Sequence, residues 1–179
     1  MLRLMCRACL PAPNRGGNGR GPKGHDGTFT IDLPDRMWGT DSTATVTGEG
    51  QAAIFITVDH CTQECIGIHS ALQGTSFEAL EPICQGIREH YGSYTSQVAP
   101  GLMLRHDNGS QHTSSYFKQE LRFLGTAGSP AYVREPKSNG VAERLIRTLM
   151  AQQLWLQHFE TVPELKRGLQ ALQRRYNRP

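Results

Sequence analysis

The stretch 37–69 decides the fold of this chain. It contains MWGTDSTATVT at 37–47, AAIFITVD at 52–59 and CIGIH at 65–69. All three segments are rich in Val, Ile or Thr, and short links separate them, with Gly48 and Gly50 in the first link. This pattern is typical of strands joined by tight turns. The sequence therefore predicts a three-stranded antiparallel meander.

Helices and short strands alternate after the meander. Thr75-Ser-Phe-Glu78 is a capping-box sequence, with Thr75 as the N-cap and Glu78 bonding back to it, and it predicts a helix that ends near Gly92. Further elements are expected as a strand at 102–106, a helix at 115–124, a strand at 127–131, a long helix at 141–159 and a final helix from Thr161. The long helix is expected to turn Val141, Leu145, Leu149 and Gln152 toward the core. This order predicts an α/β fold with helices packed on a sheet.

The composition excludes an integral membrane protein. The 179 residues are 37% hydrophobic and 20% charged, which suits one folded domain plus a tail. No apolar run approaches the roughly 18 residues that a membrane-spanning helix needs. The N-terminus is a poor secretory signal, and the five cysteines show no disulfide spacing, so we expect a reducing compartment, the cytoplasm.

Positive charge is concentrated at the two ends of the chain. The net charge is only +3, but residues 1–28 hold five basic groups against one acidic group. This Gly/Pro/Arg-rich segment is expected to form a flexible basic leader, followed by a folded core at 29–179. A second basic cluster follows Glu164, the last acidic residue. It comprises Lys166, Arg167, Arg174, Arg175 and Arg178.

Two groups of Cys and His residues are candidate zinc ligands. Cys6 and Cys9 form a C-x-x-C pair, but no second pair follows at zinc-site spacing. A second group lies within the meander, where the alternating apolar pattern favours buried thiols and ordinary strand residues. It comprises His60, Cys61, Cys65 and His69.

Three carboxylates stand at positions suited to chemistry. Asp41 lies inside a strand, where Asp is unfavourable. Asp107 ends another strand, where open α/β sheets place ligand-binding groups, and Glu143 lies in the first turn of a helix. Singly, Asp107 is explained as a turn residue and Glu143 as favoured by the helix dipole. Together they can converge on hard divalent cations such as Mg²⁺, and two such ions support in-line phosphoryl displacement.

Two motifs surround the last two acids, LRHDNGSQHTS at 104–114 and PKSNGVAERLIRTL at 136–149. With 35 residues between Asp107 and Glu143, WGTD at 38–41 and YNRP at 176–179, they resemble the integrase catalytic core of bacterial insertion-sequence transposases related to retroviral integrases, the DDE type. The resemblance runs from about His25 to the end. Asp59 competes for the place of the first acid, but the motif around Asp41 fits better and Asp59 falls near a strand end.

The resemblance implies an RNase H-like fold, with a mixed five-stranded sheet that starts as an antiparallel meander, continues with parallel strands and carries helices on both faces. It implies that Asp41, Asp107 and Glu143 are catalytic and bind metal, two Mg²⁺ or Mn²⁺ ions in the active state. Ser110 and Gln111 are expected either to orient the active-site turn or to be plain turn residues. Cationic and amide side chains near Glu143 are expected to bind the DNA backbone. These are Lys137, Asn139, Arg144 and Arg147.

The implied function is DNA cleavage and strand transfer by a transposase or integrase, a polynucleotidyl transferase acting on element ends and target DNA as a homo-oligomer. Two alternatives remain. The first is an RNase H-like nuclease that only hydrolyses nucleic acid, and the second is an inactive DNA-binding remnant. The family's N-terminal DNA-binding part has no counterpart in this sequence, and we expect it to be missing or on another chain.

Overall fold

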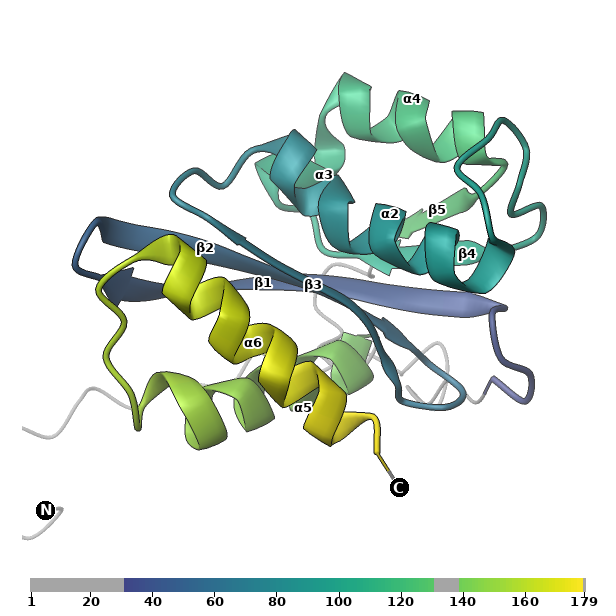
Figure 1. Ribbon diagram of the computed structural model, residues 1–179. Helices are drawn as coiled ribbons and strands as arrows, with labels where there is room; N and C mark the ends of the chain where they lie inside the picture. The colour runs from purple at the N-terminus through teal and green to yellow at the C-terminus, as the bar shows by residue number, and fades with distance from the viewer. Residues whose placement is uncertain (1–30, 131–138, 179) are drawn as a thin grey trace, which may run out of the picture.

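The computed structural model describes residues 31–130 and 139–178 as a mixed sheet with helices on both faces (Figure 1). The five strands have the order β3-β2-β1-β4-β5. Their bounds are β1 Met37–Thr47, β2 Gly50–Asp59, β3 Cys65–Ala71, β4 Met103–His106 and β5 Ala127–Pro130. The predicted leader at 1–28 lies outside the described residues.

The first three strands form the predicted meander. β1 pairs antiparallel with β2, and β2 pairs antiparallel with β3. β4 then pairs parallel with β1, and β5 pairs parallel with β4, so β1 occupies the centre of the sheet. The α/β class and the change from an antiparallel meander to parallel strands are both confirmed.

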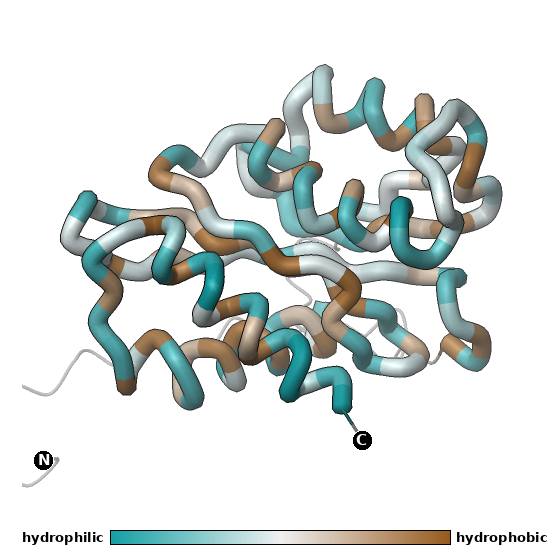
Figure 2. Tube along the Cα trace, in the orientation of Figure 1, coloured by the Kyte–Doolittle hydropathy of each residue, from teal (hydrophilic) through white to brown (hydrophobic). Residues whose placement is uncertain are grey.

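Two hydrophobic clusters separate the sheet from its helices. On one face, α2 (Ser76–Tyr91) and α4 (Ser115–Leu124) pack with α3 (Ser110–Thr113) nearby. On the other face lie α5 (Gly140–Leu149) and α6 (Val162–Tyr176). Each cluster is lined by fully buried side chains, including Trp38 in the first and Leu145 in the second. Figure 2 shows these apolar segments along the strands and the inner helix faces.

The capping box at the start of α2 forms only in part. Thr75 Oγ1 accepts the backbone N–H of Glu78 as predicted. The Glu78 carboxylate, however, contacts His69 Nε2 on β3 at 2.5 Å, which ties the helix to the sheet. Close packing of the same two elements depends on Gly67, where a Cβ atom would overlap the backbone of Pro82 in α2. The sequence pattern predicted the N-cap at Thr75, but it did not predict the contact between Glu78 and His69.

The long helix predicted at 141–159 is shorter than expected. α5 ends at Leu149 and continues as a π-helical turn, η2, at Met150–Leu154. Trp155 N–H donates to the Met150 carbonyl, the five-residue spacing of a π-turn. The wider turn leaves Gln152 exposed and buries Gln153 in its place, so the prediction that Gln152 faces the core is wrong.

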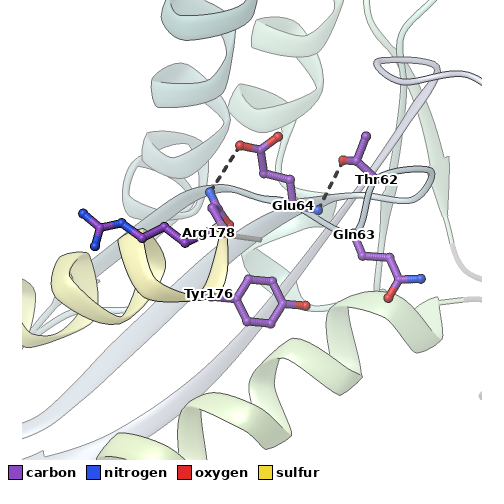
Figure 3. A pocket seen from close by; sticks show the side chains of 6 residues that line it. Thr62, Gln63, Glu64, Tyr176 and Arg178 are labelled. Atoms are coloured by element: carbon purple, nitrogen blue, oxygen red, sulfur yellow. Dashed lines mark hydrogen bonds between the residues drawn. The ribbon is translucent and has the colours of Figure 1, made fainter.

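The end of α6 is tied to the edge strand β3. Asn177 Oδ1 accepts the Cys65 N–H, and Asn177 Nδ2 donates to the Cys65 carbonyl and to Glu64. Figure 3 shows Tyr176 lying toward the turn that holds Gln63, whereas the side chain of Arg178 points away from that turn. Among the described residues, no helix combines the length and apolarity needed to span a membrane.

Candidate active site

The parallel pairing of β1 and β4 places two of the predicted acids side by side. Gly39 on β1 is in register with Arg105 on β4. The same register carried two residues further puts Asp41 opposite Asp107, just beyond the end of β4. The two acids are far apart in the sequence, but the pairing of these two central strands brings them close together. Asp107 follows the carboxyl end of β4, the end of a strand at which α/β folds place functional groups.

Asp107 is held in a fixed orientation by its own turn. Its Oδ1 accepts the Gly109 N–H at 3.0 Å and contacts His112 Nδ1 at 2.6 Å. The hydrogen bond from His112, first among several causes, holds the pKa of Asp107 below its usual value, so the carboxylate is ionised and His112 Nδ1 is the donor. The His112 side chain is completely buried, beside the rings of His106 and Phe117.

His112 is a supporting residue that the sequence did not single out. It follows Asp107 by five positions within a run that the motif already contained. Only the four-residue helix α3 turns it back onto the carboxylate. The same turn bears Gln111, whose Nε2 donates to Ser42 Oγ at 3.3 Å and so links Asp107's turn to the residue after Asp41. The role of Gln111 in orienting the active-site turn stays a prediction.

Asp41 has an unusual electrostatic environment. The pKa of its carboxyl is raised to about 6, mainly by burial and in part by the negative charges of Asp107 and Glu143, while the hydrogen bond from Ser42 N–H acts against this rise. Like charges near each other favour the protonated form of at least one acid. The three acids therefore influence one another, although they come from distant parts of the sequence.

Glu143 is positioned by the way α5 meets the sheet. α5 packs against β1 and β2 and places Glu143 in its first turn. Directly before the helix, Asn139 Nδ2 donates to the carbonyl of Thr40 at 3.0 Å, a buried hydrogen bond next to Asp41. The Asn139 side chain also interacts with His60. The start of α5 is thus fastened to the strand that carries the first acid.

The donor chemistry of the three acids suits a divalent cation, but their positions do not yet form a metal site. In the described ranges, no three His, Cys, Asp or Glu side chains lie close enough together to hold an ion. One oxygen of Asp107 and one of Asp41 are already engaged by hydrogen bonds. Binding of an ion by all three acids therefore requires their carboxylates to lie closer together than they do here.

Asp59, the competing candidate for the first acid, accepts hydrogen bonds from the backbone. It is almost fully buried, and its two oxygens accept the backbone N–H groups of Cys61, Thr62 and Asp35. It therefore stabilises the β2–β3 turn. This bonding agrees with the preference for Asp41 as the first acid.

The four residues expected to bind DNA fall into three situations. Lys137 lies outside the described residues. Asn139 is buried and bonded to Thr40, so in this conformation it fastens α5. Arg144 and Arg147 are exposed on α5 beside Glu143, and Arg144 donates to Gln63. Among the described residues of this set, Arg144 and Arg147 are the ones whose guanidinium groups are exposed to solvent.

The Cys and His residues of the meander are separated by the fold. Cys65 is buried, and burial raises the pKa of its thiol to about 12. His69 contacts Glu78, and His60 lies next to Asn139, with its pKa lowered mainly by burial. Cys61, Cys65 and Cys84 are free thiols. Cys6 and Cys9 lie outside the described residues.

Curated relatives of this chain are transposases, although no protein-family model matches it. The chain is 27% identical over 137 residues to the transposase for insertion sequence element IS904 of Lactococcus lactis, covering 76% of this chain and 51% of the relative. It is 24% identical over 128 residues to transposase InsD for insertion element IS2 of Escherichia coli, covering 71% of this chain and 42% of the relative. The chain thus spans about half the length of these relatives.

Solved structures with the same fold are integrase and transposase cores. The catalytic domain of Mos1 transposase with Raltegravir and Mg has a TM-score of 0.59 at 15% identity, covering 77% of this chain and 70% of that one. A chain of the simian T-cell lymphotropic virus intasome has a TM-score of 0.57 at 22% identity, covering 74% and 45%. These confirm the expected RNase H-like fold. The chain therefore shares the fold of integrase and transposase catalytic cores, and its sequence is similar to those of insertion-sequence transposases.

Proposed function

We propose that this chain is the catalytic core of a DNA transposase that cleaves a phosphodiester at an element end and transfers the resulting 3′-hydroxyl to target DNA. The observation that carries the proposal is the register of β1 and β4, which brings Asp41 opposite Asp107 and beside the helix start that bears Glu143. The relationship to insertion-sequence transposases supports the reaction class.

The three acids would hold two Mg²⁺ or Mn²⁺ ions in the active state. When bound, such ions activate the attacking oxygen and stabilise the leaving one in an in-line displacement. The chain contributes the geometry. His112 and the Gly109 N–H keep Asp107 ionised in one orientation, and the Asn139–Thr40 bond fixes the entry of α5 next to Asp41.

The cations beside Glu143 would position the DNA. Arg144 and Arg147 are exposed on α5 and present guanidinium groups suited to phosphate oxygens. Lys137 is assigned the same role on sequence grounds alone. Such contacts orient the backbone without distinguishing bases, so recognition of element ends is assigned to parts of the transposase beyond this core. Since two ends must be joined to one target, the active form is a homo-oligomer on DNA.

A joining assay tests the proposal. The full chain is incubated with supercoiled plasmid and a fluorescent duplex oligonucleotide bearing a free 3′-hydroxyl, with Mg²⁺ or Mn²⁺. The expected product is plasmid covalently linked to the label, abolished by EDTA and by Asp107→Asn or Glu143→Gln. Glu89→Gln, which neutralises an exposed acid on α2, is the matched control and retains activity. Joining that survives both site substitutions would refute the assignment of the three acids.

The same assay separates the alternatives. Plasmid nicking that depends on metal and on the three acids, without covalent transfer of the label, identifies a nuclease that only hydrolyses DNA. DNA binding with neither nicking nor transfer identifies an inactive remnant.

A further inference from the structure

The charge of the described residues is divided between α6 and the rest of the fold. Residues 162–178 hold five Lys or Arg and one Glu, a net charge of +4. The other described residues hold seven Lys or Arg and 13 Asp or Glu, a net charge of −6. Within the part of the chain that the structure describes, none of the five cations of this segment forms an ion pair with a carboxylate.

Three of these cations line a shallow groove between the end of α6 and the π-turn η2. The groove has guanidinium and carboxamide groups on its walls and no carboxylate. Its lining residues are Arg174, Arg175 and Arg178 with Ala171 on one side, and Gln152, Gln153 and Gln157 on the other. Arg175 also lines an adjoining depression beside Leu156. Figure 2 shows that the C-terminal end of α6 is hydrophilic, in contrast to the helix's inner face.

The groove adjoins the exposed cations of α5. Arg144 and Arg147 stand on the solvent side of α5, and Ala151, four residues after Arg147, lines the depression that Arg175 shares. α5 and α6 lie on the same face of the sheet (Figure 1). Arg144 is also near enough to the end of α6 to lower the pKa of Tyr176 against the raising effect of burial. Arg144 and Arg147 thus lie between the first helical turn of α5, which contains Glu143, and the groove.

We propose that the groove formed by η2 and the end of α6 binds the sugar-phosphate backbone of duplex DNA, outside the site of the three acids. Guanidinium and carboxamide groups donate hydrogen bonds to phosphate oxygens and carry no base-specific information at the backbone. A cationic surface on an otherwise acidic body attracts a polyanion over a distance. The choice of DNA as that polyanion rests on the proposed function, whereas the groove itself does not include the three acids.

The test measures DNA binding without catalysis. Fluorescence anisotropy with a labelled random-sequence duplex of about 30 base pairs, in EDTA and at several salt concentrations, gives the affinity and its salt dependence. The triple substitution Arg174→Gln, Arg175→Gln, Arg178→Gln is compared with Arg88→Gln, Lys118→Gln, Arg122→Gln, which removes three exposed cations from α2 and α4. Circular dichroism confirms that both variants are folded. A third variant, Arg174→Lys, Arg175→Lys, Arg178→Lys, keeps the charge and is called the Lys variant.

The groove triple is expected to weaken binding at least tenfold, and to reduce the slope of log K against log salt by about 2 to 3, since each phosphate contact contributes about 0.9. The control triple and the Lys variant are expected to stay within about threefold of the parent. Equal losses for both Gln triples, or an unchanged slope, would overturn the proposal. So would competition by polyglutamate as strong as that of DNA, which would identify an acidic protein partner.

The outcome is separable from that of the proposed function. Asp107→Asn is expected to bind the duplex as tightly as the parent chain in EDTA while losing strand transfer. Loss of binding in the groove triple with intact binding by Asp107→Asn supports the groove whether or not the core proves catalytic.

Discussion

Asp41 is expected to destabilise the metal-free fold at neutral pH. The pKa of its carboxyl is raised from 3.8 to about 6 by burial and by the charges of Asp107 and Glu143. A tenfold change in a proton affinity is worth about 1.36 kcal/mol, so this difference corresponds to at most about 3 kcal/mol. Because the side chain is only partly buried, solvent screening lowers the expected effect to about 1 to 3 kcal/mol.

The sign follows from proton binding. The folded chain binds the Asp41 proton more tightly than the unfolded chain does, so protonation stabilises the fold below about pH 4, and this stabilisation is lost as the pH rises through about 6. Asp41→Asn mimics the protonated acid at every pH. It is therefore expected to raise the free energy of unfolding by about 1 to 3 kcal/mol near pH 7.5 and to change it little near pH 4.

The assay is urea denaturation of the metal-free chain, followed by circular dichroism, at several pH values. Asp32→Asn removes one exposed carboxylate and serves as the control, with a change within about 0.5 kcal/mol. Addition of Mg²⁺ near pH 7.5 is expected to stabilise the parent chain more than Asp41→Asn, because the cation replaces repulsion by attraction. An Asp41→Asn gain that is absent near pH 7.5, or equal at both pH values, would refute the reasoning.

Three further outcomes follow from particular contacts. Gly67→Ala forces a Cβ atom onto the backbone of Pro82, and we expect a loss of about 1 to 3 kcal/mol in urea denaturation; a neutral result would mean that α2 can shift away from β3. Asn139→Ala removes the buried bond to the Thr40 carbonyl, so we expect faster amide exchange in the first turn of α5 by mass spectrometry, and unchanged exchange there would contradict its fastening role. Cys65, whose thiol pKa is about 12, is expected to resist iodoacetamide near pH 8 until the chain is unfolded in urea, and labelling of folded Cys65 would show that β3 opens locally.

The elements that the sequence predicted well are those with local signals. The strand at 37–47 and the helix at 115–124 were predicted with their observed bounds, because richness in Thr and Val and helical spacing of apolar residues are local signals. The π-turn was missed because the helical pattern of the sequence continues through it. Gln153, which lies in this turn, is buried next to Gly168 on α6, a contact between segments far apart in the sequence.

The sequence singled out three acids as a candidate site, which stays a prediction, and it did not reveal the hydrogen bonds around them. Spacing and motif resemblance singled out Asp41, Asp107 and Glu143, and the strand register brings the first two together. The bonds that hold them depend on tertiary structure. Neither the turn of α3 that aims His112 at Asp107 nor the burial of Asn139 against Thr40 leaves a periodic signal in the sequence.

The hydrogen bonds between Asn177 and the backbone of Cys65 affect whether another copy of this chain can pair with strand β3. β3 is an edge strand, and an edge strand offers free backbone N–H and C=O groups on which a strand of another molecule can add. At Cys65 the N–H is taken by Asn177 Oδ1, and the C=O by Asn177 Nδ2 and Gln173 Nε2. The carboxamide occupies the place of a neighbouring peptide group. The end of α6 thus blocks self-association by strand addition at this point of β3.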